Sequence, residues 1–429
     1  MSHSEARSAS RRAVLGGAAG VLGAALAPPL AAYAGNGSGP RQPAFEESVD
    51  AVASRLDGEL IELRRDIHRH PETAGREERT AGVVARRLRA AGLDVTTGVG
   101  GHGVVGILAG ARRGRTIAYR ADMDALVPGD QVGGGTQAAH FCGHDLHTTI
   151  GVGIAEVLAR LRDRLAGTVA FVFQPAEETL TGAAAMLDAG VFARVRPAEI
   201  HALHCGPFPV GKFLVAPGFG LPGQDRGVIT LTGADAMARA RQLAAEIGAL
   251  GTVARPASPA DLDRIVADVQ TPNSPLAEFV FMNAGVGNED RAEVRVSYRC
   301  WPEERYVEVR EDIHRLARSY GEASVSFPND PFPAMVCPER EGRALQRYLH
   351  RTVGRDRVAP MHAAIPFNGE DFALFLNQVP GTFTFLGVRA PGAAIETSYP
   401  HFGAFTPDER AIGHGVRAMA GWLASRTRA

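Results

Sequence analysis

The stretch His140-Phe141-Cys142-Gly143-His144-Asp145-Leu146-His147 decides how this sequence is interpreted. It places one thiol, three imidazoles and one carboxylate within eight residues, and these groups are common ligands of zinc and related metals. Outward from it, further ligand types recur in the order Glu177-Glu178, His201 and His204, and His401. A single histidine would usually be a packed or surface residue. The ordered set instead indicates a hydrolytic site for one or two metal ions.

Helix and strand patterns alternate around this stretch. Apolar residues at helical spacing predict helices over 46–70, 79–91 and 148–165. Short apolar runs predict strands at 104–108, 116–119, 168–173 and 199–204. Glu177 and Glu178 follow one of these strands and His204 ends another, which is the usual placement of ligands in an open α/β sheet. We therefore expect an α/β fold.

The pattern changes around Gln224. Strands are predicted at 227–232, 279–283 and 291–299, and helices at 235–250, 259–269 and 303–320. The alternation then resumes and closes with a helix over 409–426. We expect one catalytic domain, residues 45–224 and 335–429, interrupted by an α+β lid over 225–334.

Length and composition allow a large globular enzyme. The chain has 429 residues, which suggests two or three domains, and its net charge is −1. This charge gives no electrostatic argument for nucleic acid or an anionic membrane as a partner. The four cysteines have no spacing typical of a disulfide scaffold.

The N-terminus has the features of a targeting segment. Ser10-Arg11-Arg12-Ala13-Val14-Leu15 is a twin-arginine signature, an apolar run over 13–27 follows, and Ala32-Tyr33-Ala34 is a small-x-small cleavage site. We predict a signal peptide over residues 1–34 and export by the twin-arginine pathway to the cell envelope, periplasm or exterior. The apolar run is short and glycine-rich for a stable membrane anchor, although an uncleaved signal anchor is the alternative.

Seven stretches together give a family resemblance. They are Arg65-Asp66-Ile67-His68-Arg69-His70-Pro71-Glu72, Arg120-Ala121-Asp122-Met123-Asp124, the stretch around Cys142, Gln174-Pro175-Ala176-Glu177-Glu178, Leu203-His204, Gly369-Glu370-Asp371-Phe372 and His401-Phe402-Gly403-Ala404-Phe405. The chain resembles the M20 metallopeptidase clan, in its branch of N-acyl-amino-acid amidohydrolases with hippurate and auxin-conjugate hydrolases. The resemblance implies a Zn-peptidase-like catalytic domain with an inserted α+β lid and dimerisation domain.

The resemblance also implies roles for single residues. Cys142, His144, Glu178, His204 and His401 match the metal ligands. Glu177 matches the general base that takes a proton from water. Zinc or manganese is expected, with one or two ions per subunit.

Three carboxylates are candidates to orient the ligand imidazoles from behind, namely Asp122, Asp124 and Asp145. Surface or capping roles are equally open for them. Glu177 and Glu178 are expected on an extended segment, where neighbouring side chains point apart. One carboxylate then binds metal while the other faces the substrate.

The lid departs from the family. The family carries a lid histidine that reaches the partner's site in a dimer, but this chain has no histidine between His204 and His314. Arg299 resembles the arginine that receives the substrate carboxylate, and Asn288 is the best match to a family asparagine. A homodimer through the lid is therefore expected to be structural.

Three functions compete. The first is an exported metal-dependent amidohydrolase of N-acyl amino acids or related small amides. The second is an exopeptidase or dipeptidase of the same clan. The third is a non-catalytic metal-binding protein with a remodelled lid, against which the retained Glu177 argues, since a pure binder needs no base beside the metal.

Overall fold

The computed structural model describes residues 43–288 and 291–428. The predicted signal peptide lies outside these residues. From Pro43 onward the chain forms one compact unit.

The helices and strands follow the predicted alternation. The helices are α1 (Phe45–His68), α2 (Glu78–Ala90), α3 (His144–Arg160), α4 (Gly182–Asp188), α5 (Val191–Val195), α6 (Ala236–Gly248), α7 (Pro259–Val269), α8 (Arg305–Arg318), α9 (Glu339–Thr352), α10 (Phe372–Leu376) and α11 (Arg410–Arg426). The strands are β1 (Asp94–Thr97), β2 (Val104–Ala109), β3 (Arg112–Asp122), β4 (Ala166–Gln174), β5 (Glu199–Pro209), β6 (Phe213–Val215), β7 (Gly220–Leu221), β8 (Asp225–Leu231), β9 (Phe279–Asn288), β10 (Arg291–Trp301), β11 (Ala323–Ser326), β12 (Met335–Val336), β13 (Val358–Pro360) and β14 (Gly381–Arg389).

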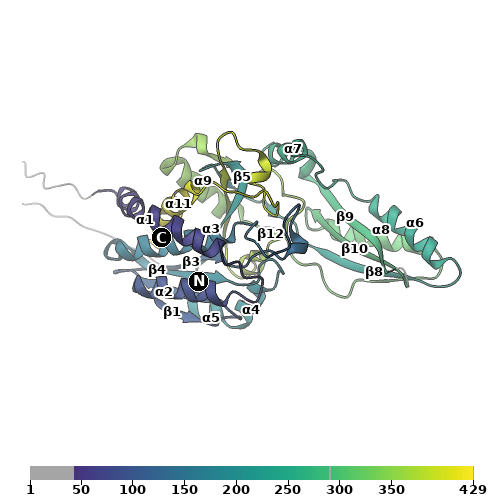
Figure 1. Ribbon diagram of the computed structural model, residues 1–429, viewed down its shortest axis with the longest axis horizontal. Coiled ribbons are helices and arrows are strands. Elements are labelled where there is room, and N and C mark those ends of the chain that lie inside the picture. The colour runs from purple at the N-terminus through teal and green to yellow at the C-terminus, as the bar shows by residue number, and fades with distance from the viewer. Residues whose placement is uncertain (1–42, 289–290, 429) are drawn as a thin grey trace, which may run out of the picture. The chain divides into compact units, whose positions relative to one another are not determined.

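An eight-stranded mixed sheet is the centre of the larger part (Figure 1). Its order is β1-β2-β4-β3-β5-β14-β6-β13, and the neighbours β4, β3, β5 and β14 run parallel. The carboxyl ends of parallel strands meet at one edge of the sheet. Asp122 ends β3 directly beside Gln174, which ends β4. The segments after these strands therefore start from the same edge.

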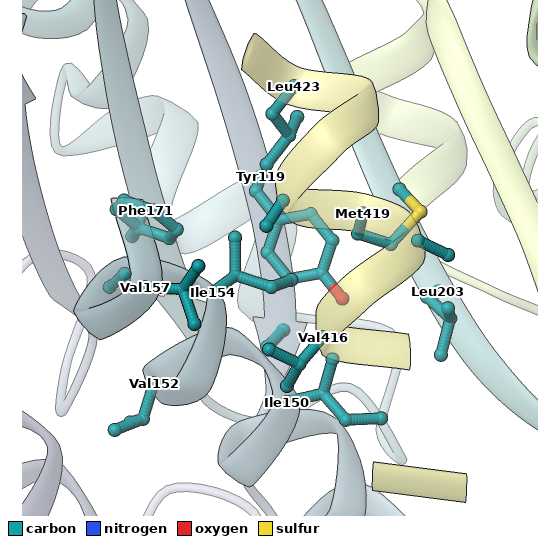
Figure 2. Close-up of a cluster of buried hydrophobic side chains, with 14 of the residues drawn as sticks. Tyr119, Ile150, Val152, Ile154, Val157, Phe171, Leu203, Val416, Met419 and Leu423 are labelled. Carbon is teal, nitrogen blue, oxygen red and sulfur yellow. The ribbon is translucent and has the colours of Figure 1, made fainter. Parts of the chain in front are cut away.

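Helices cover both faces of this sheet. Alternating strand residues face opposite sides, so Tyr119 packs into one apolar cluster and Ala118 into another. Figure 2 shows Tyr119 of β3 and Phe171 of β4 packed against Ile154 of α3 and Met419 of α11. Helices α1, α3 and α11 pack on one another over this face. This double burial explains why the strand sequences are nearly continuous apolar runs.

Some predicted boundaries differ from the structure. The helix expected over 148–165 is α3, which begins earlier, at His144. It begins there because Gly143 adopts a left-handed conformation, with φ of 85°, directly before it. His204 also lies inside β5 rather than at its end, because β5 continues to pair with β14 as far as Pro209.

The inserted segment forms a separate antiparallel sheet of four strands in the order β11-β8-β10-β9. Helices α6 and α8 bury an apolar cluster against one of its faces. However, α7 joins the core of the larger part, where Ile265 and Val269 pack with Phe208 and Leu214. Residues 225–334 therefore do not share a single core, and the expected domain boundaries stay a prediction.

Two further observations bear on the sequence analysis. All four cysteines are buried and none forms a disulfide. Within residues 43–288 and 291–428, none of the helices combines the length and the apolar character that crossing a membrane requires.

Candidate metal centre

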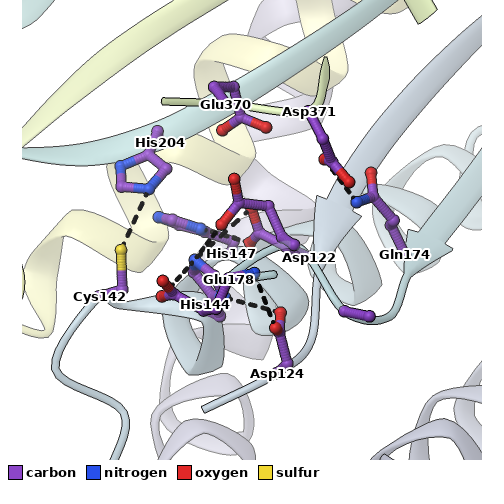
Figure 3. Close-up of polar contacts among 12 residues, drawn as sticks. Asp122, Asp124, Cys142, His144, His147, Gln174, Glu178, His204, Glu370 and Asp371 are labelled. Atoms are coloured by element: carbon purple, nitrogen blue, oxygen red, sulfur yellow. Dashed lines mark hydrogen bonds and ion pairs between the residues drawn. The ribbon is translucent and has the colours of Figure 1, made fainter. Parts of the chain in front are cut away.

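The five expected ligand residues lie together, as Figure 3 shows for four of them. The Sγ atom of Cys142 is 3.6 Å from Nε2 of His204. One oxygen of Glu178 lies 3.6 Å from Nε2 of His144, and the other lies 3.5 Å from Nε2 of His401. Residues more than 250 positions apart in the sequence therefore surround one small volume.

The imidazoles of the three expected histidine ligands each place Nδ1 against an oxygen atom and leave Nε2 facing the centre. Nδ1 of His204 lies 2.7 Å from the carbonyl oxygen of Cys205, and Nδ1 of His401 lies 3.3 Å from that of Asp130. Nδ1 of His144 lies 3.1 Å from Asp124. A carbonyl oxygen only accepts, so Nδ1 carries the proton in His204 and His401, and Nε2 keeps its lone pair. Fixing Nδ1 in this way is how proteins orient metal-binding histidines.

The donors fit a divalent metal ion. Nε2 of His144 and Oε1 of Glu178 face each other, and both are buried atoms without a hydrogen-bond partner among the described residues. Burial also raises the pKa of the Cys142 thiol well above its ordinary value, so its thiolate form requires a bound cation. Burial lowers the pKa of His204, which keeps this imidazole neutral as a ligand must be.

Of the three carboxylates expected behind the ligands, Asp124 has the most direct contact. It meets His144 and also accepts the backbone N–H of Glu178 at 2.9 Å, so it fixes two expected ligands at once. Asp122 instead holds Nδ1 of His147 at 2.6 Å. Nε2 of His147 accepts the N–H of Cys205 at 2.8 Å, so both nitrogens of this histidine are occupied.

Asp145 lies apart from the expected ligands. Its carboxylate lies 2.8 Å from Arg64 and 2.8 Å from Nδ1 of His68, and it contacts none of the expected ligands. The reason is helical geometry: Asp145 lies next to His144 on α3, and neighbouring helical positions face different directions.

The expected extended conformation of the glutamate pair is wrong. Ala176 adopts a left-handed conformation with φ of 54°, and the N–H of Leu180 bonds to the carbonyl of Glu177 at 2.7 Å. The pair thus lies in a tight turn. Both carboxylates approach Nε2 of His144, at 3.9 Å from Glu177 and 3.6 Å from Glu178.

Glu177 has an electrostatic environment suited to a base. Burial, and next the charges of Glu370 and Glu178, raise the pKa of Glu177 well above its ordinary value. For His144, burial lowers the pKa, but Asp122 and other nearby carboxylates outweigh burial and raise it to about 10. The centre therefore concentrates negative charge that a divalent cation would neutralise.

Sequence reasoning assigned no role to a buried network beside Glu177. Arg120 donates to Asp122, to Gln174 at 2.8 Å and to Glu370 at 2.9 Å, and Gln174 donates to Asp371 at 2.7 Å. Burial raises the pKa of Glu370 to about 8. These residues belong to the motifs quoted for the family resemblance, but motif membership gives no pairing. Only the fold brings Arg120 and Glu370 together.

A cavity of about 520 Å³ adjoins the centre. Its lining includes Glu177, His401 and Arg299, with apolar side chains such as Ile365. Arg299 approaches Gly369 so closely that a Cβ atom there would lie 2.4 Å from Nη1 of Arg299. Gly369 therefore leaves the space that the guanidinium of Arg299 occupies.

Asn288 lies at the end of β9 that is remote from Arg299. It ends β9 and pairs with Arg291, whereas Arg299 lies eight residues further along β10. At about 3.4 Å per residue, this separation is roughly 27 Å along the strand. The role of Asn288 that the family resemblance implies therefore stays a prediction.

Comparison with known proteins fixes the family. The model of the family described as Peptidase family M20/M25/M40 matches residues 118–425. The chain belongs to peptidase family M20. The family resemblance carried by the motifs is thereby confirmed, and so is the mixed α/β fold.

Named M20 relatives align over most of this chain. The N-acetylcysteine deacetylase of Bacillus subtilis (strain 168) is 31% identical over 371 residues, covering 82% of this chain and 93% of the deacetylase. Thermostable carboxypeptidase 1 of Saccharolobus solfataricus is 29% identical over 400 residues, covering 87% of this chain and 97% of the relative. The crystal structure of the Bacillus subtilis YXEP protein, described as a dinuclear metal-binding M20 peptidase, has a TM-score of 0.64 and 27% identity, covering 87% and 98%.

These M20 proteins share the hydrolysis of amide bonds. The present chain is therefore a metal-dependent M20 hydrolase of amide bonds, and its clustered donors suit divalent metal ions. The non-catalytic alternative is set aside by this membership.

Proposed function

We propose that this chain is an exported M20 amidohydrolase that removes the acyl group from N-acyl amino acids. Its proposed metal ligands are Cys142, His144, Glu178, His204 and His401. The observation that carries the proposal is the convergence of three Nε2 atoms on Glu178 and Cys142. A thiolate with imidazoles and a carboxylate suits zinc, and manganese is the second choice.

Glu177 is the proposed general base. It is buried, it lines the cavity, and it lies 3.9 Å from His144. A divalent cation held by the proposed ligands would supply a lower pKa for water and polarisation of the amide carbonyl. Glu177 accepts the proton of the attacking water on its carboxylate and returns it to the leaving amine.

Arg299 is the proposed anchor for the substrate carboxylate. A guanidinium binds a carboxylate through two parallel hydrogen bonds, and Arg299 lines the same cavity as Glu177. The lid histidine of the family has no counterpart between His204 and His314. Losing such a donor typically lowers kcat by about 10²–10³-fold, so weak turnover of simple substrates is expected.

Peptide cleavage is the second candidate. A relative named as a carboxypeptidase aligns over 97% of its length, and a peptide with a free carboxylate would meet the same Arg299. An N-acyl amino acid and a dipeptide differ in the acyl group on the carbonyl side of the scissile amide, which the apolar part of the cavity would receive.

A substrate panel tests the proposal. Protein loaded with zinc or manganese should release amino acids from N-acetyl and N-benzoyl amino acids, with the Glu177→Gln variant as the inactive control. Faster release from dipeptides would favour the second candidate. Failure of the loaded protein on every amide of the panel would overturn the proposal.

A further inference from the structure

Three guanidinium groups line the cavity beside the proposed metal centre. They belong to Arg226, Arg255 and Arg299. Within the part of the chain that the structure describes, none of the three has a carboxylate within ion-pair distance. Arg120, by contrast, is paired with Asp122. The cavity is also lined by carboxylates of the metal centre, but its three guanidinium groups are more than one substrate carboxylate requires.

Two of these arginines share one face of the lid sheet. Arg226 on β8 pairs with Ser297 on β10, and Arg299 follows Ser297 on the same face two positions later. Diagonal neighbours of this kind have Cβ atoms about 7–8 Å apart. Burial, and next the charge of Arg226, lower the pKa of Arg299 to about 10.

Arg255 joins the same group through an aromatic ring. Phe281 on β9 pairs with Arg299 on β10, and the guanidinium of Arg255 lies 5.4 Å from the centre of the Phe281 ring. Phe367 packs edge-on against Phe281, with 4.9 Å between ring centres. A cation over an aromatic face is held in place without losing its hydrogen-bond donors. Arg226 is likewise oriented by Gln224, to which it donates at 3.0 Å.

We propose that the amino-acid half of the substrate carries a second carboxylate, so that the preferred substrates are N-acylated acidic amino acids. This inference rests on the proposed function, in which Arg299 receives the first carboxylate. The two carboxylates of aspartate or glutamate are joined by a short chain, which matches guanidiniums on neighbouring positions of one sheet face. Arg226 and Arg255 are then specificity-determining residues that receive the side-chain carboxylate.

Arg295 provides a matched control. It lies on the same face of β10, four residues before Arg299, and among the described residues it has no ion pair. It does not line the cavity. A general effect of removing positive charge from the lid sheet would appear equally in an Arg295 variant.

The test compares isosteric substrates. We expect the metal-loaded protein to hydrolyse N-acetylglutamate with a kcat/KM at least about tenfold above that of N-acetylglutamine, mainly through KM, since one charge-assisted contact is typically worth this much. The ratio of the two values should fall toward one in Arg226→Gln and in Arg255→Gln, and should stay at the wild-type value in Arg295→Gln. Equal values in the wild type, or equal changes in all three variants, would overturn the inference.

A binding measurement separates this inference from the proposed function. In the Glu177→Gln variant, calorimetry should give a Kd for N-acetylglutamate at least about tenfold below that for N-acetylglutamine. Tighter binding of the dicarboxylate without turnover by the wild type would refute the proposed function and would support only the binding of two carboxylates by the three arginines. If the wild type turns over many N-acyl amino acids but the Glu177→Gln variant binds both ligands with equal affinity, the proposed function is supported and the inference is refuted.

Discussion

At the scale of single residues, Asp124 connects two proposed ligands. Its carboxylate meets Nδ1 of His144 and the backbone N–H of Glu178. Asp145, also fully buried, contacts Arg64 and His68 instead. The two aspartates therefore form a matched pair: both are buried and hydrogen-bonded, but only one supports the proposed metal centre.

We predict that Asp124→Asn weakens metal binding. Contacts of this kind typically account for about 10–100-fold in metal affinity. Competition against a chelator would measure the affinity, and Asp145→Asn is the control. Asp145→Asn should lower thermal stability, because it weakens the ion pair with Arg64, but it should leave metal affinity unchanged. Equal losses of affinity in the two variants would refute the role of Asp124.

Sequence predicted the chemical types at the centre better than their geometry. The motifs indicated which residues come together at the centre, and the roles of the ligands and of Glu177 stay predictions. The turn at Glu177 did not follow from the motifs, because it depends on the left-handed conformation of Ala176, a residue type that rarely adopts it. The contact of Arg120 with Glu370 joins residues 250 positions apart, and no local pattern encodes it.

At the scale of elements, the start of α3 fixes the position of Cys142 relative to His144. Gly143 between them has φ of 85°, and a Cβ atom there would lie 2.4 Å from Sγ of Cys205. The backbone must therefore bend sharply against β5 at this point. Only glycine meets both the conformational and the steric requirement.

We predict that Gly143→Ala lowers both stability and metal affinity. The left-handed conformation alone costs a non-glycine residue about 1–2 kcal/mol, and the contact with Cys205 adds to this. Gly75→Ala is the control, because Gly75 has φ of 76° but nothing lies within 4 Å of its added Cβ. Thermal unfolding should show destabilisation in both variants, while chelator competition should show weaker metal binding only in Gly143→Ala. Normal metal affinity in that variant would contradict the account of this turn.

The C-terminal helix α11 is tied to the sheet by a buried carboxylate. Glu199 at the start of β5 is 1% exposed and lies 2.9 Å from Arg115 of β3 and 2.8 Å from Arg426 of α11. Burial by itself raises the pKa of Glu199, but His201 and Arg426 outweigh burial and hold it well below the ordinary 4.5.

We predict that Glu199→Gln destabilises the fold by about 1–3 kcal/mol at neutral pH. The pKa of Glu199 is lower in the folded state than in the unfolded state. Its contribution to the free energy of unfolding is therefore complete above the ordinary pKa and is lost as pH falls through the folded-state pKa. Unfolding curves of wild type and variant should therefore converge as pH falls below about 5. Glu339→Gln, which affects an exposed pair with Arg343, should change little. A stability difference that is constant with pH would argue against the ion pair.

Elements were predicted well where a periodic pattern is long. The helix expected over 259–269 is α7, with a proline at its first position and the Ser258 side chain capping it. The residues against which α7 packs could not be predicted, because an apolar face on a helix does not specify which hydrophobic core it joins. The same limit explains why α7 joins the larger core despite lying inside the insert.

At the scale of the whole molecule, export and assembly stay predictions. The twin-arginine signature lies outside the described residues, and the lid has two edge strands, β9 and β11, where a second copy could pair. A dimer would be structural because the chain has no histidine between His204 and His314 to reach across.

We predict that replacing Arg11 and Arg12 by lysine retains the protein in the cytoplasm. The twin-arginine pathway recognises the arginine pair itself. Immunoblots of cytoplasmic and exported fractions would measure this, with an Arg7→Lys variant as a control outside the pair. Normal export of the double variant would rule out this route.

The central claim is that Glu178 binds metal while its neighbour Glu177 transfers the proton. Measuring bound metal by elemental analysis together with kcat in Glu177→Gln and Glu178→Gln tests it most directly. The account predicts that Glu177→Gln keeps its metal and loses about 10²–10⁴-fold in kcat, whereas Glu178→Gln loses metal and activity together. Near-normal kcat in Glu177→Gln, or unchanged metal content in Glu178→Gln, would contradict it.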